Sequence, residues 1–232
     1  MATLSDLSSK AMDAASNTNV APHIDVWVRW VIDDVWNARL WPFRRRPMAA
    51  VDTVLNETSI QLPSNFAHPD NFRILTPQTE AGRLPDVDDN DLKILVPDPT
   101  DTTNASKPKV WRRPIRSDGT NKFMDFWPPA DGIYGIGGDY FIKNPAIDGA
   151  DTVLIPDEWH HVVTIGAQIY IKSHEEEVNL RPWQDDFNRA LGRMMNDVMK
   201  NQGSLKGWKS ERYLRNLRGA LSGIANDLDI RR

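Results

Sequence analysis

The fold is decided by the stretch LIPDEWHHVVTIGAQIY, residues 154–170. Pro156 suits the first turn of a helix, and the carboxylates of Asp157 and Glu158 suit the positive end of its dipole. The residues after them repeat at three- and four-residue spacing on one face, which is typical of a helix that buries that face: Trp159, Val162, Val163, Gly166, Ile169 and Tyr170. The stretch therefore predicts a helix that packs against other helices.

Further helices are predicted on both sides of this one. A second helix from Pro182 forms an antiparallel pair with it and has its own apolar face of Phe187, Leu191, Met194, Met195, Val198 and Met199. Upstream, the same spacing predicts a helix from Ile24 to Trp41, ended by Pro42 and Pro47. A short amphipathic piece containing Leu4, Leu7 and Met12 precedes it. The residues expected to pack the helical core are Trp27, Val31, Val35, Trp159, Val163 and Ile169.

The segment between these helices has a different pattern. Short runs rich in β-branched and aromatic residues alternate with Pro, Asp and Gly clusters, which predicts strands at residues 59–62, 72–75, 92–96 and 139–142. We therefore predict an α+β fold with a helical bundle core, an inserted small β-domain and an extended C-terminal helical arm. The expected divisions are an N-terminal segment with the first core helix (1–43), the β-rich domain (44–150), the core helical pair (151–200) and the arm (201–232).

Composition excludes several classes of protein. The chain has 232 residues, of which 40% are hydrophobic and 26% charged, so it has enough apolar residues for a folded core. It lacks cysteine, which excludes disulfides, thiolate nucleophiles and cysteine-ligated zinc. No stretch approaches the roughly 18 apolar residues of a membrane span, and no signal peptide is expected at the N-terminus. The formal net charge of −4 is too small to indicate nucleic acid or a membrane as a partner.

Charge is distributed unevenly along the chain. Between Asp86 and Asp101 six aspartates stand against Lys93 alone, whereas between Lys200 and Arg218 six basic residues stand against Glu211 alone. Two interpretations stay open for both segments: solvated faces, or surfaces that bind a partner. Binding of a divalent cation by the acidic segment is a further interpretation, although the segment lacks the glycine and the distal glutamate of a calcium loop.

The C-terminal segment carries a narrow apolar strip, spaced alternately by three and four residues: Leu214, Leu217, Leu221, Ile224 and Leu228. An isolated helix of this length is marginal in water and needs a surface to lie on. That surface is either the protein's own helical bundle or a groove on a partner.

No constellation of catalytic residues is found. His160 and His161 follow Glu158, but their spacing differs from the H-E-x-x-H that places two zinc ligands on one helical face. His161 is expected to lie half-buried beside the apolar face. Residues 132–138 are rich in glycine but lack the lysine of a phosphate-binding loop, and they are interpreted as a flexible connection before a strand. We predict no catalytic residue, no metal and no cofactor, and therefore no enzyme.

Trp111 stands out among the tryptophans because its neighbours are basic: Lys107, Lys109, Arg112, Arg113 and Arg116. Such a cluster could contact phosphate or an anionic partner. A solvated loop is the favoured interpretation.

Four sequence landmarks follow one another over about residues 24–200. They are the helix end Leu40-Trp41-Pro42-Phe43, the segment Ile60 to Phe66 with its Leu62-Pro63, the segment Met124 to Pro129, and the helix start Leu154 to Ala167. Their order resembles the head-to-tail adaptor (connector) proteins of tailed bacteriophages, of the type with a β-domain inserted in a helical core. Asn65 stands where an aspartate is usual in that family, and residues 80–106 are longer and more polar than is typical.

This resemblance implies a structural function in the neck of a virion, after assembly in the host cytoplasm. Adaptors of this kind form a ring, normally of twelve copies, that docks beneath the portal protein, connects it to tail or nozzle proteins and lets double-stranded DNA pass. Fibres are further candidate partners, and we expect acidic residues to predominate in the channel. The residues expected to bind the portal lie in the arm: Trp208, Arg212, Leu214, Arg215, Leu217, Arg218, Leu221 and Ile224.

Two other functions stay open at this point. A DNA-binding or packaging protein could use the basic arm, and its binding to duplex DNA would depend strongly on salt. A tail or fibre-attachment protein could use the β-domain instead.

Overall fold

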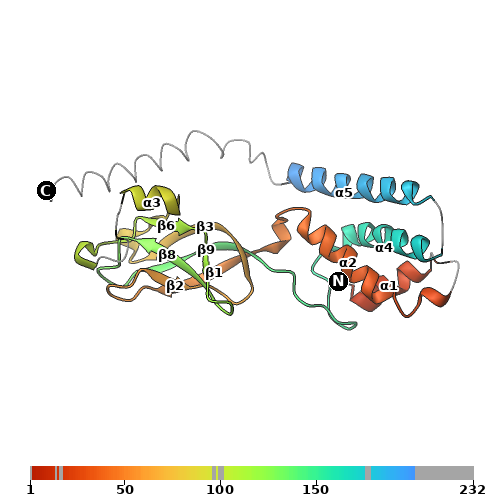
Figure 1. Cartoon of the computed structure of the whole chain (residues 1–232), viewed down its shortest axis with the longest axis horizontal. Helices are drawn as coiled ribbons and strands as arrows, with labels where there is room; N and C mark the ends of the chain where they lie inside the picture. The colour runs from red at the N-terminus through yellow and green to blue at the C-terminus, as the bar shows by residue number, and fades with distance from the viewer. Residues whose placement is uncertain are drawn as a thin grey trace. The chain divides into compact units, whose positions relative to one another are not determined.

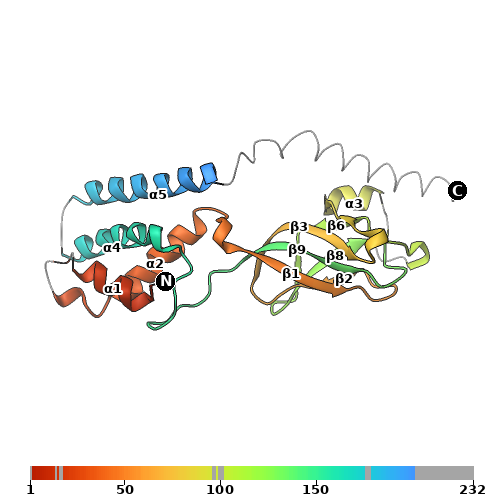
Figure 2. The ribbon, with the colours of Figure 1, turned by 180° about the vertical axis from the view of Figure 1, so that it is seen from behind.

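The structure, a computed structural model, describes residues 2–13, 15, 18–95, 98, 102–175 and 179–201. These residues belong to two compact units. A helical unit lies within Met1–Arg44 and Asn144–Ser204, and a β-domain contains Arg45–Lys143 (Figure 1; the reverse side is in Figure 2). The described strands lie in the β-domain and most of the described α-helices lie in the helical unit, so the predicted α+β fold class is confirmed.

The described part of the helical unit contains α1 (Leu4–Met12), α2 (Ile24–Asn37), α4 (His160–His174) and α5 (Arg181–Asn201), with 3-10 turns at Thr18–Val20, Pro42–Arg44 and Asp157–Trp159. α4 is central, because it contacts α1, α2 and α5. Figure 1 shows α4 and α5 side by side with the chain reversing direction between them, as predicted. α1 starts with a capping box, in which Thr3 accepts a hydrogen bond from Asp6 N and Asp6 accepts one from Thr3 N.

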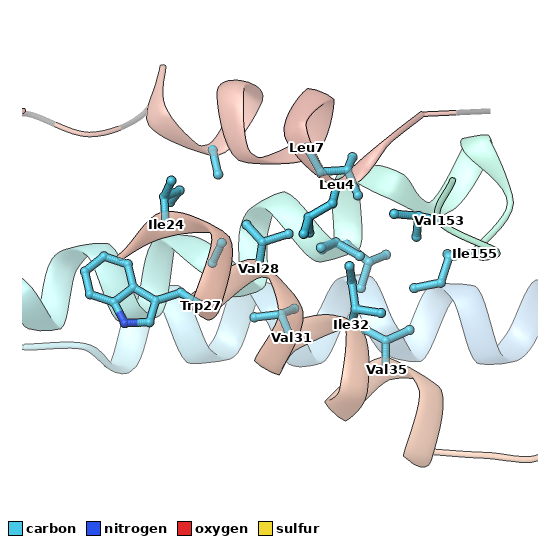
Figure 3. Packing of buried hydrophobic residues seen from close by; sticks show 14 of the residues in the cluster. Leu4, Leu7, Ile24, Trp27, Val28, Val31, Ile32, Val35, Val153 and Ile155 are labelled. Carbon is cyan, nitrogen blue, oxygen red and sulfur yellow. The ribbon is translucent and has the colours of Figure 1, made fainter. Parts of the chain in front are cut away.

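The core of the helical unit is apolar and closely packed (Figure 3). Val28, Val31 and Val35 on α2 are no more than 1% exposed, and they point toward α1 and α4. Leu4 and Leu7 of α1 close this core on one side. Each such residue contributes about 1.5–3 kcal/mol by burial, so the unit has the apolar content of an independent core.

Gly166 of α4 lies where three helices approach one another. A Cβ atom built on it would collide with Cγ1 of Val31 on α2 and would lie 2.9 Å from Cε2 of Phe187 on α5. The small residue in the motif that predicts α4 is therefore required by packing, because any side chain would push α2 or α5 away.

The end of α2 differs from the prediction. The helix ends at Asn37 and not at Trp41. Nε1 of Trp41 donates to the carbonyl oxygen of Val35 at 2.6 Å, and Nη1 of Arg44 donates to that of Trp36 at 2.8 Å. The helix therefore stops because side chains that follow it take over its last carbonyl groups, and Pro42 lies in the 3-10 turn that brings those side chains back.

The described β-domain contains two sheets. One has the order β1 (Arg45–Asp52), β9 (Gly135–Ile142), β3 (Phe66–Thr76) and β4 (Gly82–Arg83). The other has the order β2 (Ser59–Gln61), β8 (Lys122–Trp127), β6 (Val110–Arg113) and β5 (Asp86–Asp88), with β7 (Arg116–Ser117) also on β8. β5 pairs parallel to β6, whereas the other pairs are antiparallel. Phe66, Phe72, Met124 and Ile136 are buried in this domain.

The strand predicted at residues 92–96 is wrong. Residues Asp89–Leu95 form a helix, α3. Leu92 is 2% exposed and Ile94 is 79% exposed, so only one side of this apolar run is buried. Asp89 near the start and Lys93 one turn later form an ion pair at 2.6 Å, which favours the helix locally.

The flexible glycine-rich connection is also wrong, because residues from Gly135 onward form the start of β9. Gly138 has φ of +149°, and a Cβ there would collide with the carbonyl oxygen of Asn71 on β3. Glycine thus allows β3 and β9 to pair closely at an irregular register.

Candidate interaction surfaces

The two histidines at the start of α4 occupy different environments. His160 is 5% exposed, with Nε2 at 2.7 Å from the carbonyl oxygen of Ile155 and Nδ1 at 3.5 Å from a carboxylate oxygen of Asp157. His161 is exposed, and its Nδ1 lies 2.9 Å from the carbonyl oxygen of Glu158. The half-buried position predicted for His161 is therefore wrong, since the 3-10 turn before α4 rotates His160 inward. Within the described ranges, no group of three or more His, Asp or Glu side chains is placed to hold a metal ion.

Ion pairs join the acidic segment to the basic residues around Trp111, as one separate pair and one network. Arg113 contacts Asp86 at 2.7 Å, and Arg112 contacts Asp89 at 3.3 Å. Asp125 of β8 accepts from Arg112 at 2.6 Å and lies 3.2 Å from Arg116. These charges neutralise one another inside the β-domain. The network fastens α3 to the sheet of β6 and β8, which leaves less charge for an anionic partner or a cation.

Trp111 itself is part of the core. Its side chain is 5% exposed, and its ring meets that of Phe72 edge-on, with centroids 5.3 Å apart. The solvated loop favoured by its basic neighbours is therefore wrong. Within β6, Val110 and Trp111 are buried whereas Arg112 is half-buried and Arg113 is exposed, so basic neighbours in the sequence do not place Trp111 on the surface.

Acidification is expected to loosen α3. The Lys93 ammonium, hydrogen-bonded to Asp89, holds the pKa of that carboxyl below its usual value, and Arg112 adds to the effect. A carboxyl with a lowered folded-state pKa contributes stability above its unfolded value of 3.8 and loses it as pH falls through the folded value. The Asp89→Asn variant should therefore be less stable than the wild type at pH 7, with a difference that shrinks as the pH falls below 3.8. Thermal unfolding of both proteins at pH 7 and over the acidic range below 3.8 measures this, and an equal difference in both ranges would contradict it.

The helical unit exposes an aromatic surface. Trp30 on α2 is 49% exposed, and its ring meets that of Tyr170 on α4 at 5.5 Å between centroids. Val26, one turn before Trp30, is 42% exposed. Burial raises the pKa of Tyr170, and the nearby charge of Asp34 raises it further, so the phenol stays protonated and able to donate. Exposed tryptophan and tyrosine are the residues most enriched at the energetic centres of protein interfaces.

The chain matches the family model of the SU10 adaptor protein over residues 2–208. It belongs to this phage adaptor family. The matched range includes residues of both the helical unit and the β-domain, so the family model covers both units. A comparison with curated proteins finds no match. The resemblance to phage adaptors is thus confirmed at the level of the family.

The adaptor places the predicted core residues as follows. Trp27, Val31, Val35 and Val163 lie in the core of the helical unit. Trp159 is half-buried and packs against that core, and Ile169 is half-buried on α4. The arm residues from Trp208 to Ile224 lie outside the described residues, so their predicted role stays a prediction.

The adaptor also carries features that sequence reasoning missed. Nothing in the spacing of Asp86, Asp89 and Asp125 indicates their pairing with the arginines, because these aspartates come from β5, α3 and β8 and their partners from other elements. In the part of the adaptor that the structure describes, no helix is long and apolar enough to cross a membrane.

Proposed function

We propose that the adaptor assembles into a ring, in which helical segments 1–43 and 151–200 contact neighbouring copies and the arm at 201–232 docks on the portal protein. The ring joins the capsid vertex to the tail and leaves a channel for DNA. The observation that carries this proposal is the match to an adaptor family over residues 2–208. An adaptor acts by joining other proteins, so its function resides in surfaces.

The aromatic surface of α2 and α4 supports contact between copies. A closed ring needs a head-to-tail interface in which two different surfaces of each copy meet. Trp30 and Tyr170 provide one such surface without a change in the fold, since both side chains already project from packed helices. A rigid aromatic residue loses little conformational entropy on binding.

The composition of the C-terminal arm supports docking on an acidic groove. Arg212, Arg215 and Arg218 alternate with the apolar strip that begins at Leu214 and Leu217. Such a segment suits a partner surface with carboxylates beside an apolar channel. We propose that the arm binds the portal protein in this way and becomes resistant to protease in the complex.

The test is to mix the adaptor with the portal ring of its own phage and to measure mass by mass photometry and symmetry by negative-stain imaging. The full chain is expected to join the portal as a ring, whereas a chain ending at Asn201 should lose this association by at least about tenfold while keeping the helical unit intact. An Arg212→Gln, Arg215→Gln, Arg218→Gln variant separates charge from apolar contact, because its loss of binding should be largest at low salt.

Three outcomes would contradict the proposal or one of its parts. If the full chain ignores the portal but binds duplex DNA with strong salt dependence, the DNA-binding or packaging function is favoured. If the full chain binds neither the portal nor DNA, the favoured function is attachment of a tail component or fibre through the β-domain. Equal protease resistance of residues 202–232 with and without portal would overturn the docking of the arm.

A further inference from the structure

Two loops of the β-domain expose large apolar side chains. Val54 and Leu55, in the loop between β1 and β2, are 55% and 59% exposed, and Ile133, in the loop between β8 and β9, is 72% exposed. The loops are joined by backbone hydrogen bonds, from Asn56 N to Ala130 O at 2.8 Å and from Ala130 N to Glu57 O at 3.1 Å. The adjoining loops therefore bring Val54, Leu55 and Ile133 to the same end of the β-domain, here named the apolar tip.

The apolar tip has a fixed backbone. Thr53 is 2% exposed; its Oγ1 donates to Gly132 O at 2.9 Å and accepts from Tyr134 N at 2.9 Å. Its backbone N–H donates to Tyr134 O at 2.9 Å. The turn of Val54 is closed by Glu57 N, which donates to Val54 O at 3.1 Å. A surface ordered in this way loses little entropy on binding, unlike a loop that must fold against its partner.

The position of the apolar tip leaves it accessible within the β-domain. In the antiparallel pair of β1 and β9, Arg45 lies opposite Phe141 at the end where the chain enters and leaves the domain. Asp52 lies opposite Gly135 at the other end, next to the apolar tip. At ~3.3 Å per residue, the strands carry the tip about 25 Å from those connections.

The rim of the apolar tip is acidic. Asp52, Glu57 and Asp131 are exposed, and residues 52–57 and 130–134 contain no lysine or arginine. The hydroxyl of Tyr134 donates to the Asp131 carboxylate at 2.7 Å; burial and this bond raise the pKa of Tyr134 to about 12. Like charge opposes contact with the tip of a second copy and with DNA phosphates. The apolar tip is therefore complementary to a partner whose surface has an apolar pocket surrounded by positive charge.

We propose that the apolar tip binds a different protein of the phage particle, one with an apolar pocket bordered by lysine or arginine. Ile133, Val54 and Leu55 fill the pocket, and the three carboxylates face its basic rim. This surface is separate from the arm that the proposed function assigns to the portal, but it rests on that function in placing the adaptor in the particle.

The test places the photo-crosslinking residue p-benzoylphenylalanine at position 133 of the full chain during phage growth. Purified particles are irradiated, and the adducts are sequenced by mass spectrometry. The expected adduct joins position 133 to a different particle protein, in a peptide with basic and apolar residues. The same probe at Ile94, which is 79% exposed on α3, is the matched control and should not yield that adduct.

A charge reversal tests the rim separately. With the probe at position 54, the Glu57→Lys variant should yield at least about tenfold less adduct, because it places a cation against the basic rim. Adducts with a second copy, with residues 202–232 of the chain, or with no protein overturn the proposal, as does an unchanged yield in Glu57→Lys. Particles that lack the adaptor altogether would instead refute the proposed function.

Discussion

Replacing Gly166 with valine is expected to destabilise the helical unit by about 3 kcal/mol. The position has no room for a side chain, since a Cβ atom alone collides with Val31 Cγ1 and approaches Phe187 Cε2 to 2.9 Å. Valine adds two methyl groups beyond that atom, so α2 or α5 must move outward and the packing of both is weakened. Alanine should cost less, because part of the steric cost is offset by its helix propensity, which exceeds that of glycine by about 1 kcal/mol.

Gly192→Ala is the matched control for this prediction. Gly192 lies on α5, and a Cβ built there meets no atom within 4 Å. The same substitution in the same unit should therefore stabilise the protein by roughly 0.5–1 kcal/mol through helix propensity alone. Urea unfolding followed by tryptophan fluorescence measures all three variants. If Gly166→Val and Gly192→Ala change the free energy of unfolding equally, the close packing at Gly166 does not control stability.

The helices could be predicted because their apolar residues are local and periodic. Val28, Val31 and Val35 repeat at the spacing of one helical face, and the same residues form the core of the helical unit. The family could be predicted for a related reason, since its landmarks are short motifs such as Trp41-Pro42-Phe43 that keep their order along the chain.

The β-domain was less predictable because its structure depends on contacts between distant residues. The run Leu92 to Leu95 is apolar enough for a strand, but Asp89 pairs with Lys93 and with Arg112 of β6, and the run forms a helix. The glycines around Gly138 indicate a flexible loop from sequence alone, whereas in the structure Gly138 is needed because Asn71 on β3 approaches it closely. Short apolar runs do not distinguish helix from strand by periodicity alone.

The candidate surfaces show the same limit. Trp30 lies on the same helix as the buried Trp27, yet it is 49% exposed because the face of α2 that it occupies is only partly covered by Tyr170. Ile133 and Val54 lie 79 positions apart, and only the hydrogen bonds between their loops, such as those of Thr53, show that the loops adjoin. The sequence pattern of one segment cannot indicate how exposed its side chains are when that exposure also depends on a second segment packed beside it.

Replacing Arg44 with methionine is expected to destabilise the helical unit by about 2 kcal/mol. Arg44 is 4% exposed, and Nη1 donates to the carbonyl oxygens of Trp36 at 2.8 Å and Arg39 at 3.2 Å. Its guanidinium also lies over the Trp36 ring, 4.8 Å from the centroid. Burial lowers the pKa of Arg44, but an arginine remains charged at neutral pH, so a cation sits at the negative end of the α2 dipole.

Two effects oppose each other in this variant. Methionine removes the cost of burying a charge, which by itself can stabilise a protein. It also leaves the buried carbonyl group of Trp36 and the part-buried carbonyl group of Arg39 without this donor. We expect the second effect to win because the guanidinium meets two carbonyl groups and an aromatic ring at once.

Lysine at position 44 separates these contributions. An ammonium keeps the charge but lacks the planar guanidinium that spans two carbonyl groups and stacks on Trp36, so Arg44→Lys should lose about half as much stability as Arg44→Met. Arg189→Met is the control, because among the described residues Arg189 forms only an exposed pair with Asp186 at 3.1 Å, and this variant should change stability by less than about 0.5 kcal/mol. Urea unfolding measures the free energy of unfolding of these variants, and hydrogen exchange over residues 33–44 measures the protection of the last turn of α2. If Arg44→Met leaves the exchange of the last turn of α2 unchanged, the carbonyl groups there are satisfied without Arg44, and α2 ends at Asn37 for another reason.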